Sequence, residues 1–267
     1  MMRALTAFRR NPGRILAMSG QAFRRRPLSG MCAVCGRRSL FVNCAEIRRE
    51  SYKCVFCGAI SRNRHVAKVV ARLLAGPAAA SLAAAVARFP DKSVFEAQAS
   101  GPVHRQLRRL PGYVCSEYFA DIEPGGHTAG GIRCEDVQGL TFADATFDIV
   151  IAQDVMEHVR APESGWREIH RVLRPGGSFV FTIPYYQDRA TRRRVDTSSG
   201  RDIPLLPLEY HSDGIRDGLV YTEFGSDLPQ ELNRVGFQTH IDWSTVDSER
   251  RDGIVMSWVF ICSRSAE

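Results

Sequence analysis

Short apolar runs alternate with amphipathic and polar segments along residues 91–184. The apolar runs predict strands at residues 94–97, 113–116, 132–134, 147–153 and 178–184. The run at 147–153 is almost continuously apolar, which is typical of a strand buried on both faces of a parallel sheet. A helical pattern before the last run begins at Pro162, buries Trp166 and ends at Pro175-Gly176-Gly177. This β-α-β order predicts a doubly wound α/β sheet.

The pattern changes after residue 184. Residues 184–225 show no sustained period and are expected to be irregular. Asp227 and Gln230 resemble a capping box for a helix that ends at Gly236. Two further apolar runs predict a final strand pair, a hairpin at one edge of the sheet, at residues 237–243 and 254–262.

Two C-x2-C-G units stand in the N-terminal region, with eighteen residues between their inner cysteines. The four cysteines are Cys32, Cys35, Cys54 and Cys57. Paired C-x2-C turns supply the four thiolates of a closed tetrahedral zinc site, and the glycine after each pair suits a turn with positive φ. Two disulfides or four unrelated core cysteines are the alternatives. Cys44, between the pairs, is expected to be a small core residue.

A helical connector is expected after the cysteines. Apolar residues recur at helical spacing after Ser61, Gly76-Pro77 breaks the pattern, and the Ala-rich stretch 78–89 predicts a second helix. Arg62, Arg64 and His65 are expected to form a solvated helix start, and contact with a phosphate or substrate is the alternative.

The chain carries a formal net charge of +7, and seven arginines without an acid in residues 1–30 account for the surplus. This composition predicts a basic, flexible or loosely helical tail, and a targeting peptide or a membrane-surface helix is the alternative. No apolar run approaches the roughly 20 residues that span a bilayer, and no secretory apolar segment stands near the start. The sequence therefore predicts a soluble, cytoplasmic protein without a transmembrane segment.

Polar side chains follow four of the predicted strands at the edge where an α/β sheet binds ligands. They are Glu96, Glu117, Glu135 with Asp136, and Gln153 with Asp154. Carboxylates at this edge can accept both hydroxyls of a ribose, so they indicate a nucleoside-containing ligand. Taken singly, each acid is equally typical of a solvated loop.

The segment CEDVQGLTFADATFDIVIAQDVMEHVRAPESGWREIHRVLRPGGSFVFTIP, residues 134–184, resembles the central block of class I S-adenosylmethionine-dependent methyltransferases. It is most similar to small-molecule methylases, including those of quinone biosynthesis, and the resemblance covers residues 91–263. The cysteine pairs followed by an Arg/His segment also resemble bacterial methyltransferases with an N-terminal zinc ribbon, linked to surface-glycan or secondary metabolism. The resemblance implies a Rossmann-like, mostly parallel sheet with an antiparallel last strand, S-adenosylmethionine as cofactor and a structural zinc ion.

The turn after the first strand departs from the family pattern of an acid followed by Gly-x-Gly-x-Gly. Glu96 is followed by Ala97, Gln98, Ala99, Ser100 and Gly101, so Gly101 is the one glycine kept. The small residues still allow close approach of the cofactor, whereas an NAD-type dinucleotide is disfavoured. Weakened or lost cofactor binding stays open.

The resemblance also implies roles for individual residues. Glu96, Ala97, Gln98 and Gly101 would line the methionine part of the cofactor. Gln153 and Asp154 would lie where the fourth strand meets that methionine end. Glu117 would bind the ribose, and Asp136 with the backbone of Val137 would contact the adenine. His158, in the family's EH pair, is a candidate base or a structural hydrogen-bonding residue. His211, in LEYHSDG, is a candidate base or a surface residue.

The expected domains are the tail at 1–30, a zinc ribbon at 31–60, the connector at 61–90 and a methyltransferase domain at 91–267, with an acceptor-pocket insertion at 184–225. The predicted function is methyl transfer to a small molecule or glycan, at a hydroxyl oxygen. Two alternatives are an RNA methyltransferase, in which the ribbon and tail bind nucleic acid, and a non-catalytic protein with a degenerate cofactor site.

Overall fold

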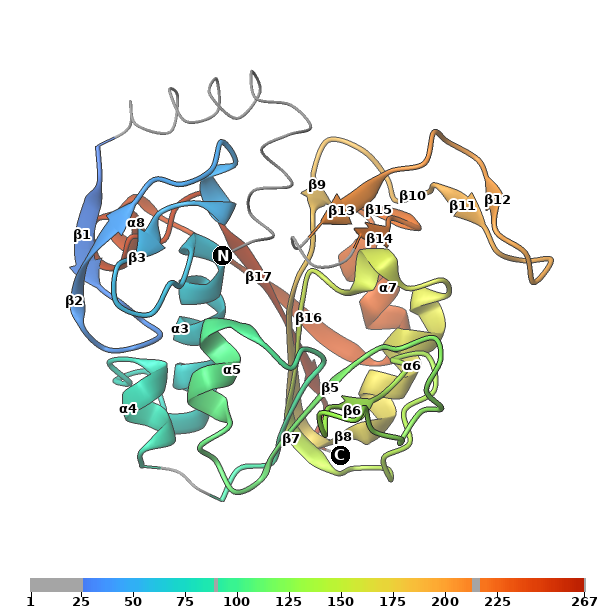
Figure 1. The fold of residues 1–267 in the computed structure, drawn as a ribbon, viewed down its shortest axis with the longest axis horizontal. Coiled ribbons are helices and arrows are strands. Elements are labelled where there is room, and N and C mark those ends of the chain that lie inside the picture. The colour runs from blue at the N-terminus through green and yellow to red at the C-terminus, as the bar shows by residue number, and fades with distance from the viewer. Residues whose placement is uncertain (1–25, 89–90, 213–216, 267) are drawn as a thin grey trace. The chain divides into compact units, whose positions relative to one another are not determined.

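A computed structural model describes residues 26–88, 91–212 and 217–266 (Figure 1). Its internal contacts divide the chain into two compact units. Of the described residues, the first unit comprises 26–88, 101–106 and 243–258, and the second comprises 91–100, 107–212, 217–242 and 259–266. Most of the predicted basic tail lies outside the described residues, and the predicted domain boundaries stay predictions.

The second unit is built on a central sheet with the strand order β16-β17-β8-β7-β4-β5-β6 (Figure 1). The strands are β4 (Val94–Glu96), β5 (Tyr113–Glu117), β6 (Arg133–Cys134), β7 (Phe147–Gln153), β8 (Leu173–Thr182), β16 (Phe237–Trp243) and β17 (Trp258–Arg264). Strands β4 to β8 pair in parallel, and β17 runs antiparallel to β8. The predicted Rossmann-like sheet with an antiparallel last strand is confirmed. The predicted pair of final strands at one edge of the sheet is confirmed, because β16 and β17 are neighbours there. The second strand begins at Trp258 and not at Ile254, and a helix stands in the connection.

Apolar side chains of β7, β8 and helix α6 (Pro162–Val172) form much of this core. Trp166 is fully buried and its ring lies 5.4 Å from that of Phe181, which stacks on Phe179. Strand β8 begins directly after α6, so the Pro-Gly-Gly sequence predicted to end the helix belongs to the strand. Helix α5 (Gly101–Leu107) follows β4 in the chain, and its residues 101–106 belong to the first unit.

Residues 184–225 are not irregular as predicted but contain short strands. These are β9 (Tyr185–Tyr186), β10 (Arg192–Arg193), β11 (Val195–Asp196), β12 (Ile203–Pro204), β13 (Tyr210–Ser212), β14 (Asp217–Leu219) and β15 (Thr222–Gly225). Strands β13 and β14 form an antiparallel pair, in which His211 faces Gly218. Helix α7 (Leu228–Val235) follows and ends at Gly236 as predicted. The predicted capping box is wrong, because the Asp227 carboxylate accepts hydrogen bonds from Thr191 instead.

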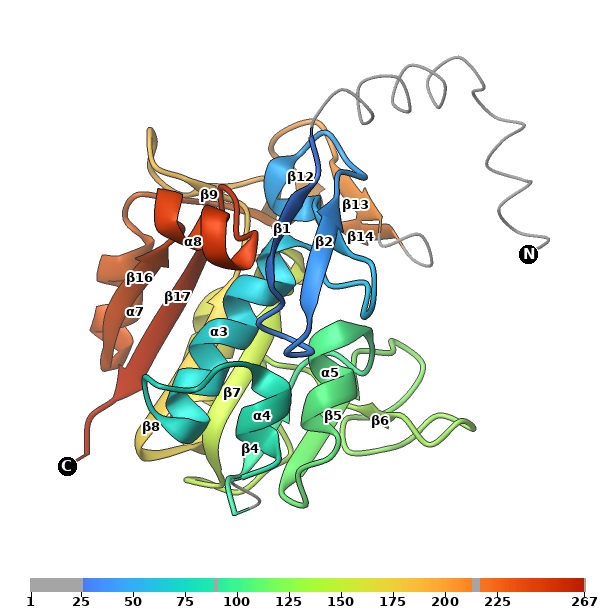
Figure 2. The same cartoon turned by 90° about the vertical axis from the view of Figure 1, so that its left-hand side faces the viewer.

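The first unit contains an antiparallel sheet of β1 (Leu28–Met31), β2 (Arg38–Val42) and β3 (Lys53–Cys54). Its helices are the 3-10 turn η1 (Arg48–Glu50), α3 (Ser61–Ala75), α4 (Leu82–Val86) and α8 (Val246–Asp252). Helices α3 and α4 pack on each other, and α8, which the sequence pattern did not reveal, packs on β1 (Figure 2). The break at Gly76 is confirmed, with φ at +80°.

Two expectations for the first unit are wrong. Arg64 and His65 are buried, not solvated. Arg64 donates to the carbonyl oxygens of Tyr52, Ala59, Asp252 and Gly253, and its guanidinium lies 4.0 Å from the centre of the Phe41 ring. Cys44 is exposed instead of lying in the core.

None of the helices within the described ranges has the length and apolar character needed to cross a bilayer.

Candidate functional site

Glu96, at the end of β4, is a fully buried acid. Its carboxyl accepts a hydrogen bond of 2.7 Å from the Tyr113 hydroxyl and one of 3.1 Å from Gln153 Nε2. Burial raises the pKa of Glu96 to about 8, although the two hydrogen bonds oppose that rise. Both carboxyl oxygens of Glu96 therefore accept hydrogen bonds from protein side chains. We infer that Glu96 positions Gln153 and the carboxyl end of β4.

The turn after Glu96 is held by side chains from the neighbouring strands. The Ala99 N–H donates to Glu117 Oε1 at 2.9 Å, and Gln153 Nε2 lies 3.5 Å from Gln98 Oε1. Gly101 has a φ of +91°, in the left-handed region that favours glycine. The structure thus brings the predicted cofactor residues of β4, β5 and β7 together at one edge of the sheet.

This edge fits an adenosyl group. Glu117 is partly exposed at the carboxyl end of β5, and its second oxygen, Oε2, can accept a ribose hydroxyl while Oε1 holds the turn. The residues at positions 97, 99 and 100 are small, so a ligand can approach their backbone.

The two acids after β6 have different partners. Glu135 is buried and accepts hydrogen bonds from Arg133 and Thr141, so it stabilises its own loop. Asp136 accepts from the Gln138 backbone at 2.9 Å and from the Gln138 side chain at 3.0 Å. Asp136 is therefore ordered at the predicted adenine position, next to Val137, which is 8% exposed.

A second cluster lies after β7, where the 3-10 turn η2 (Met156–His158) meets β13. His158 Nε2 and His211 Nδ1 each lie 3.8 Å from Glu157 Oε1, and the two imidazole rings are perpendicular with centroids 5.2 Å apart. Burial raises the pKa of the Glu157 carboxyl, and the Glu157 carboxylate raises the pKa of His211. The structure thus joins the two predicted base candidates around a carboxylate.

The sequence did not identify the residues that position these histidines. The His158 Nδ1 atom lies 2.9 Å from the Leu219 carbonyl oxygen, and a Cβ at Gly218 would lie 2.9 Å from the same nitrogen. Asp154, which precedes η2, has a φ of +51°, a conformation that costs free energy for a residue other than glycine. Gly218 was the one feature of the sequence that could have indicated a close approach to His158. The β13–β14 hairpin that contains Gly218 was not predicted from the sequence.

The Glu96→Gln substitution is expected to remove a pH dependence of stability. The folded-state pKa of about 8 lies above the ordinary 4.5, so the native state binds an extra proton between these values and loses stability as pH rises through them. At ~1.4 kcal/mol per pH unit, the wild type should lose about 2 kcal/mol more than the variant between pH 6 and pH 8. Urea denaturation of both proteins at the two pH values measures the difference. Equal losses in the two proteins would show that Glu96 ionises normally.

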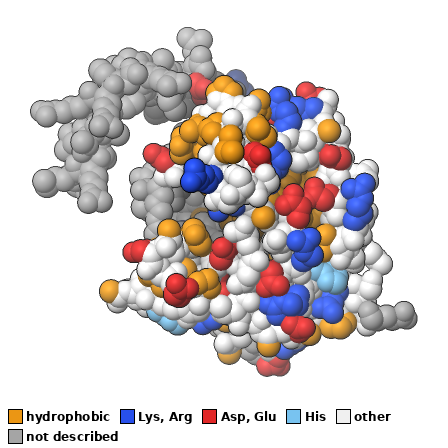
Figure 3. Space-filling view, turned by 90° about the vertical axis from the view of Figure 1, so that its right-hand side faces the viewer, with side chains coloured by type: hydrophobic (Ala, Val, Ile, Leu, Met, Phe, Trp, Pro, Cys, Tyr) orange, Lys and Arg blue, Asp and Glu red, His pale blue; other side chains and the backbone are white. Residues whose placement is uncertain are grey.

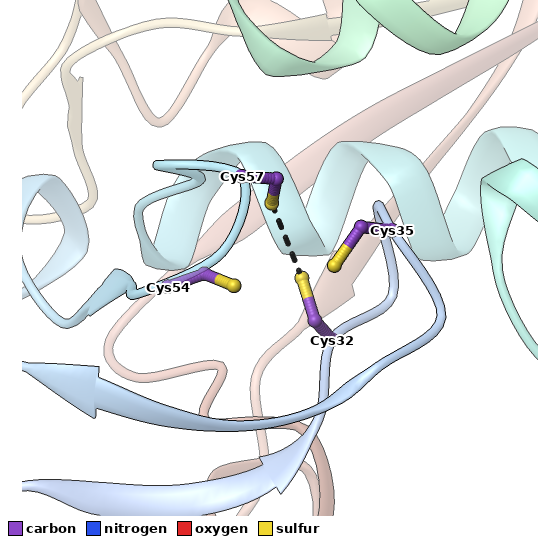
Figure 4. A group of neighbouring side chains, drawn as sticks. All are labelled: Cys32, Cys35, Cys54 and Cys57. Carbon is purple, nitrogen blue, oxygen red and sulfur yellow. Dashed lines mark hydrogen bonds between the residues drawn. The ribbon is translucent and has the colours of Figure 1, made fainter.

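The four cysteines of the C-x2-C pairs converge in the first unit (Figure 4). Their sulfur atoms lie within 4.8 Å of one another, and Cys32 Sγ is 3.7 Å from Cys57 Sγ. Four sulfurs at roughly 2.3 Å from a tetrahedral zinc ion would be roughly 3.8 Å apart, which agrees with this separation. Gly36 and Gly58, which follow the pairs, have φ values of +71° and +76°. The predicted turns are confirmed, and the arrangement fits zinc.

Nearby groups favour a thiolate at Cys54, whereas hydrogen bonding to Cys57 raises the pKa of Cys32 and burial raises the pKa of Cys35. Burial opposes ionisation of Cys54, but hydrogen bonds from Ser39 and from backbone N–H groups lower its pKa to about 7. The buried Arg64 guanidinium is attracted to Cys32, Cys54 and Cys57. A cation beside four sulfurs offsets part of the negative charge that a four-thiolate zinc site carries.

Residues 104–181, from α5 to β8, match a family model described as a methyltransferase domain. The match supports the class I S-adenosylmethionine-dependent methyltransferase family. The chain is also 31% identical over 121 residues to a sterol 24-C-methyltransferase of Eremothecium gossypii, across 43% of this chain and 28% of that protein. It is 37% identical over 77 residues to a Mycolicibacterium smegmatis protein named as an S-adenosylmethionine-dependent methyltransferase, across 29% of this chain and 27% of that protein. The chain thus spans less than a third of the length of these methyltransferase relatives.

Two solved structures are similar at low sequence identity. An S-adenosylmethionine-dependent methyltransferase from Mesorhizobium loti is 17% identical with a TM-score of 0.42, across 65% of this chain and 91% of that chain. The [4+2]-cyclase SpnF is 16% identical with a TM-score of 0.41, across 66% of this chain and 75% of that chain.

Proposed function

We propose that the protein is an S-adenosylmethionine-dependent methyltransferase that acts on a hydroxyl oxygen of a small molecule or glycan. The observation that carries the proposal is the Glu117 carboxylate, which lies against the turn after β4 through its bond to the Ala99 N–H. A carboxylate in that place can bind a ribose, and the family match covers the same part of the sheet.

In this proposal the edge of the sheet binds the cofactor. Glu117 accepts from the ribose hydroxyls, Asp136 and the Val137 backbone contact the adenine, and Ala97, Gln98, Gly101 and Asp154 line the methionine part. Glu96 and Gln153 act as positioning residues, because each holds the other. The bound cofactor supplies an electrophilic methyl group. Holding the acceptor oxygen in line with that methyl can contribute roughly 7–11 kcal/mol to the rate.

The acceptor would lie near Glu157, His158 and His211. A hydroxyl acceptor must lose a proton on transfer, and this cluster can take it. Several of the similar proteins are sterol methyltransferases, which favours a small-molecule acceptor over a macromolecule. The four cysteines would hold a structural zinc ion, as expected of the zinc-ribbon subgroup.

The RNA methyltransferase alternative is less favoured by the charges around β10. Arg189, Arg192 and Arg194 all pair with the Glu223 carboxylate, so the arginine-rich segment is partly neutralised within the protein. On the face shown in Figure 3, acidic and basic side chains are interspersed and do not form a continuous basic stripe. A phosphate backbone would be expected to require such a stripe.

Calorimetric titration with S-adenosylmethionine and S-adenosylhomocysteine tests the proposal, with NAD as the ligand control. We expect micromolar binding of both adenosyl ligands, no binding of NAD, and affinity about tenfold or more lower in Glu117→Ala, because a charge-assisted hydrogen bond contributes roughly 1.5–3 kcal/mol. Glu123→Ala, an exposed acid in the loop after β5, is the matched control and should bind as the wild type does. If the folded wild type binds neither adenosyl ligand, the non-catalytic alternative replaces the proposal.

A further inference from the structure

Glu157 is an unusual carboxylate in this structure. It is 1% exposed, and neither of its side-chain oxygens has a hydrogen-bond partner within the described part of the chain. Leaving a buried carboxylate without partners costs several kcal/mol, so such a group ordinarily marks a site for a cation or a proton donor. One nitrogen of each histidine lies 3.8 Å from Glu157 Oε1, which is too long for a hydrogen bond.

Each histidine turns one nitrogen toward Glu157 and has a partner for the other. His158 directs Nε2 toward Glu157, while its Nδ1 donates to the Leu219 carbonyl oxygen at 2.9 Å. His211 directs Nδ1 toward Glu157, while its Nε2 lies 3.5 Å from Glu209 Oε1. In metal-binding histidines, the ring nitrogen that does not bind the metal usually donates to a carbonyl or carboxylate oxygen. This hydrogen bond fixes the tautomer and the orientation of the ring.

The distances suit one ion between the three side chains. One ligand atom from each residue lies within 4.8 Å of the other two. Two ligands that each bind an ion at roughly 2.1 Å are at most about 4.2 Å apart, so closure around the ion needs movements of less than about 1 Å. The negative charge of Glu157 favours a cation in this position, and nearby Asp154 adds to that charge.

We propose that Glu157, His158 and His211 bind a divalent transition-metal cation. Two imidazoles and one carboxylate form a ligand set that suits Zn²⁺ or Fe²⁺ better than the hard cations Mg²⁺ and Ca²⁺, and Mn²⁺ is a weaker-binding probe of the same site. Three protein ligands leave coordination positions open for an oxygen from water or from a bound molecule. The site is separate from the four-cysteine cluster, and its existence does not depend on the proposed methyl transfer. Under that function, the metal-free histidines can take the acceptor's proton, whereas a bound metal would occupy the nitrogens that face Glu157.

The test compares metal binding by the full-length protein and its variants. After exposure to Zn²⁺ and removal of weakly held metal, elemental analysis should find about one zinc ion per chain fewer in His211→Ala than in the wild type. Titration with Mn²⁺, followed by the loss of the free-ion electron paramagnetic resonance signal, should show affinity about tenfold or more lower in His211→Ala and in Glu157→Gln. His240→Ala, which removes an exposed histidine on β16, is the matched control and should behave as the wild type does.

His211 is partly exposed, so its removal is compatible with folding even if Glu157→Gln is not. Equal zinc content and equal Mn²⁺ affinity in folded wild type and His211→Ala would overturn the proposal. It would also be overturned if the wild type bound no Mn²⁺ and held no more zinc than His211→Ala.

Discussion

Replacing Cys54 with serine is expected to unfold the first unit and to lower the zinc content by about one ion per chain. The sulfur of Cys54 is one of four that converge, and strands β2 and β3 of its sheet bury only Ser39, Phe41 and Cys54. Structural zinc contributes roughly 10–16 kcal/mol to small zinc domains, which is as large as the whole stability of a typical domain. Elemental analysis and thermal denaturation followed by circular dichroism measure the two effects.

Cys44→Ser is the matched control for the zinc prediction. Cys44 lies between the two cysteine pairs in the sequence but is exposed and stands outside the cluster. Its replacement should leave zinc content and melting temperature unchanged. A Cys54→Ser protein with wild-type zinc content would rule out the four-cysteine zinc site.

Arg64→Ala is expected to destabilise the protein by about 3–5 kcal/mol, because it removes a buried cation that several buried carbonyl groups need. The guanidinium donates at 2.5 to 3.0 Å to four carbonyl oxygens from the second cysteine turn and from the end of α8. Without Arg64 these acceptors lose their partners, and the ring of Phe41 loses a cation. Urea denaturation of the zinc-loaded protein measures the change in free energy of unfolding.

Arg72→Ala controls for the loss of an arginine from the same helix. Arg72 is exposed on α3, so its removal should change the free energy of unfolding by less than about 0.5 kcal/mol. Similar losses in the two variants would mean that the carbonyl contacts of Arg64 contribute little.

The sequence predicted the central sheet well because its strands are short apolar runs with clear ends. The strand at 147–153 has the predicted bounds, since burial on both faces makes almost every residue apolar. Helix α8 was missed because it is largely polar and lies between two predicted strands. The burial of Arg64 was missed for a different reason. Two of its four partners, Asp252 and Gly253, are far away in the sequence and contribute backbone oxygens, which no side-chain pattern reveals.

The candidate site was predictable in its residue types but not in their partners. The strand-end rule located Glu117 and Asp136. It could not separate Glu135 and Asp136, whose oxygens accept hydrogen bonds within their own loop, from Glu117, whose Oε2 can accept one from a ligand. The EH pair pointed to His158, and LEYHSDG pointed to His211, but their meeting at Glu157 depends on the β13–β14 hairpin. A turn with no sustained apolar pattern on either side gives little signal of such a long-range contact.

The turn between β4 and α5 has a consequence for how the protein would respond to its cofactor. The conformation of a glycine-rich turn is determined by its own backbone. Here the turn is also held by a hydrogen bond from the Ala99 N–H to the Glu117 carboxylate, which belongs to β5. A ribose bound to the same carboxylate would share it with that amide. Order in the turn and binding of the cofactor would then be thermodynamically linked, because each restricts the Glu117 side chain. Substitutions that destabilise the turn between β4 and α5 would therefore lower the affinity for the cofactor, even where the substituted residue does not contact the cofactor.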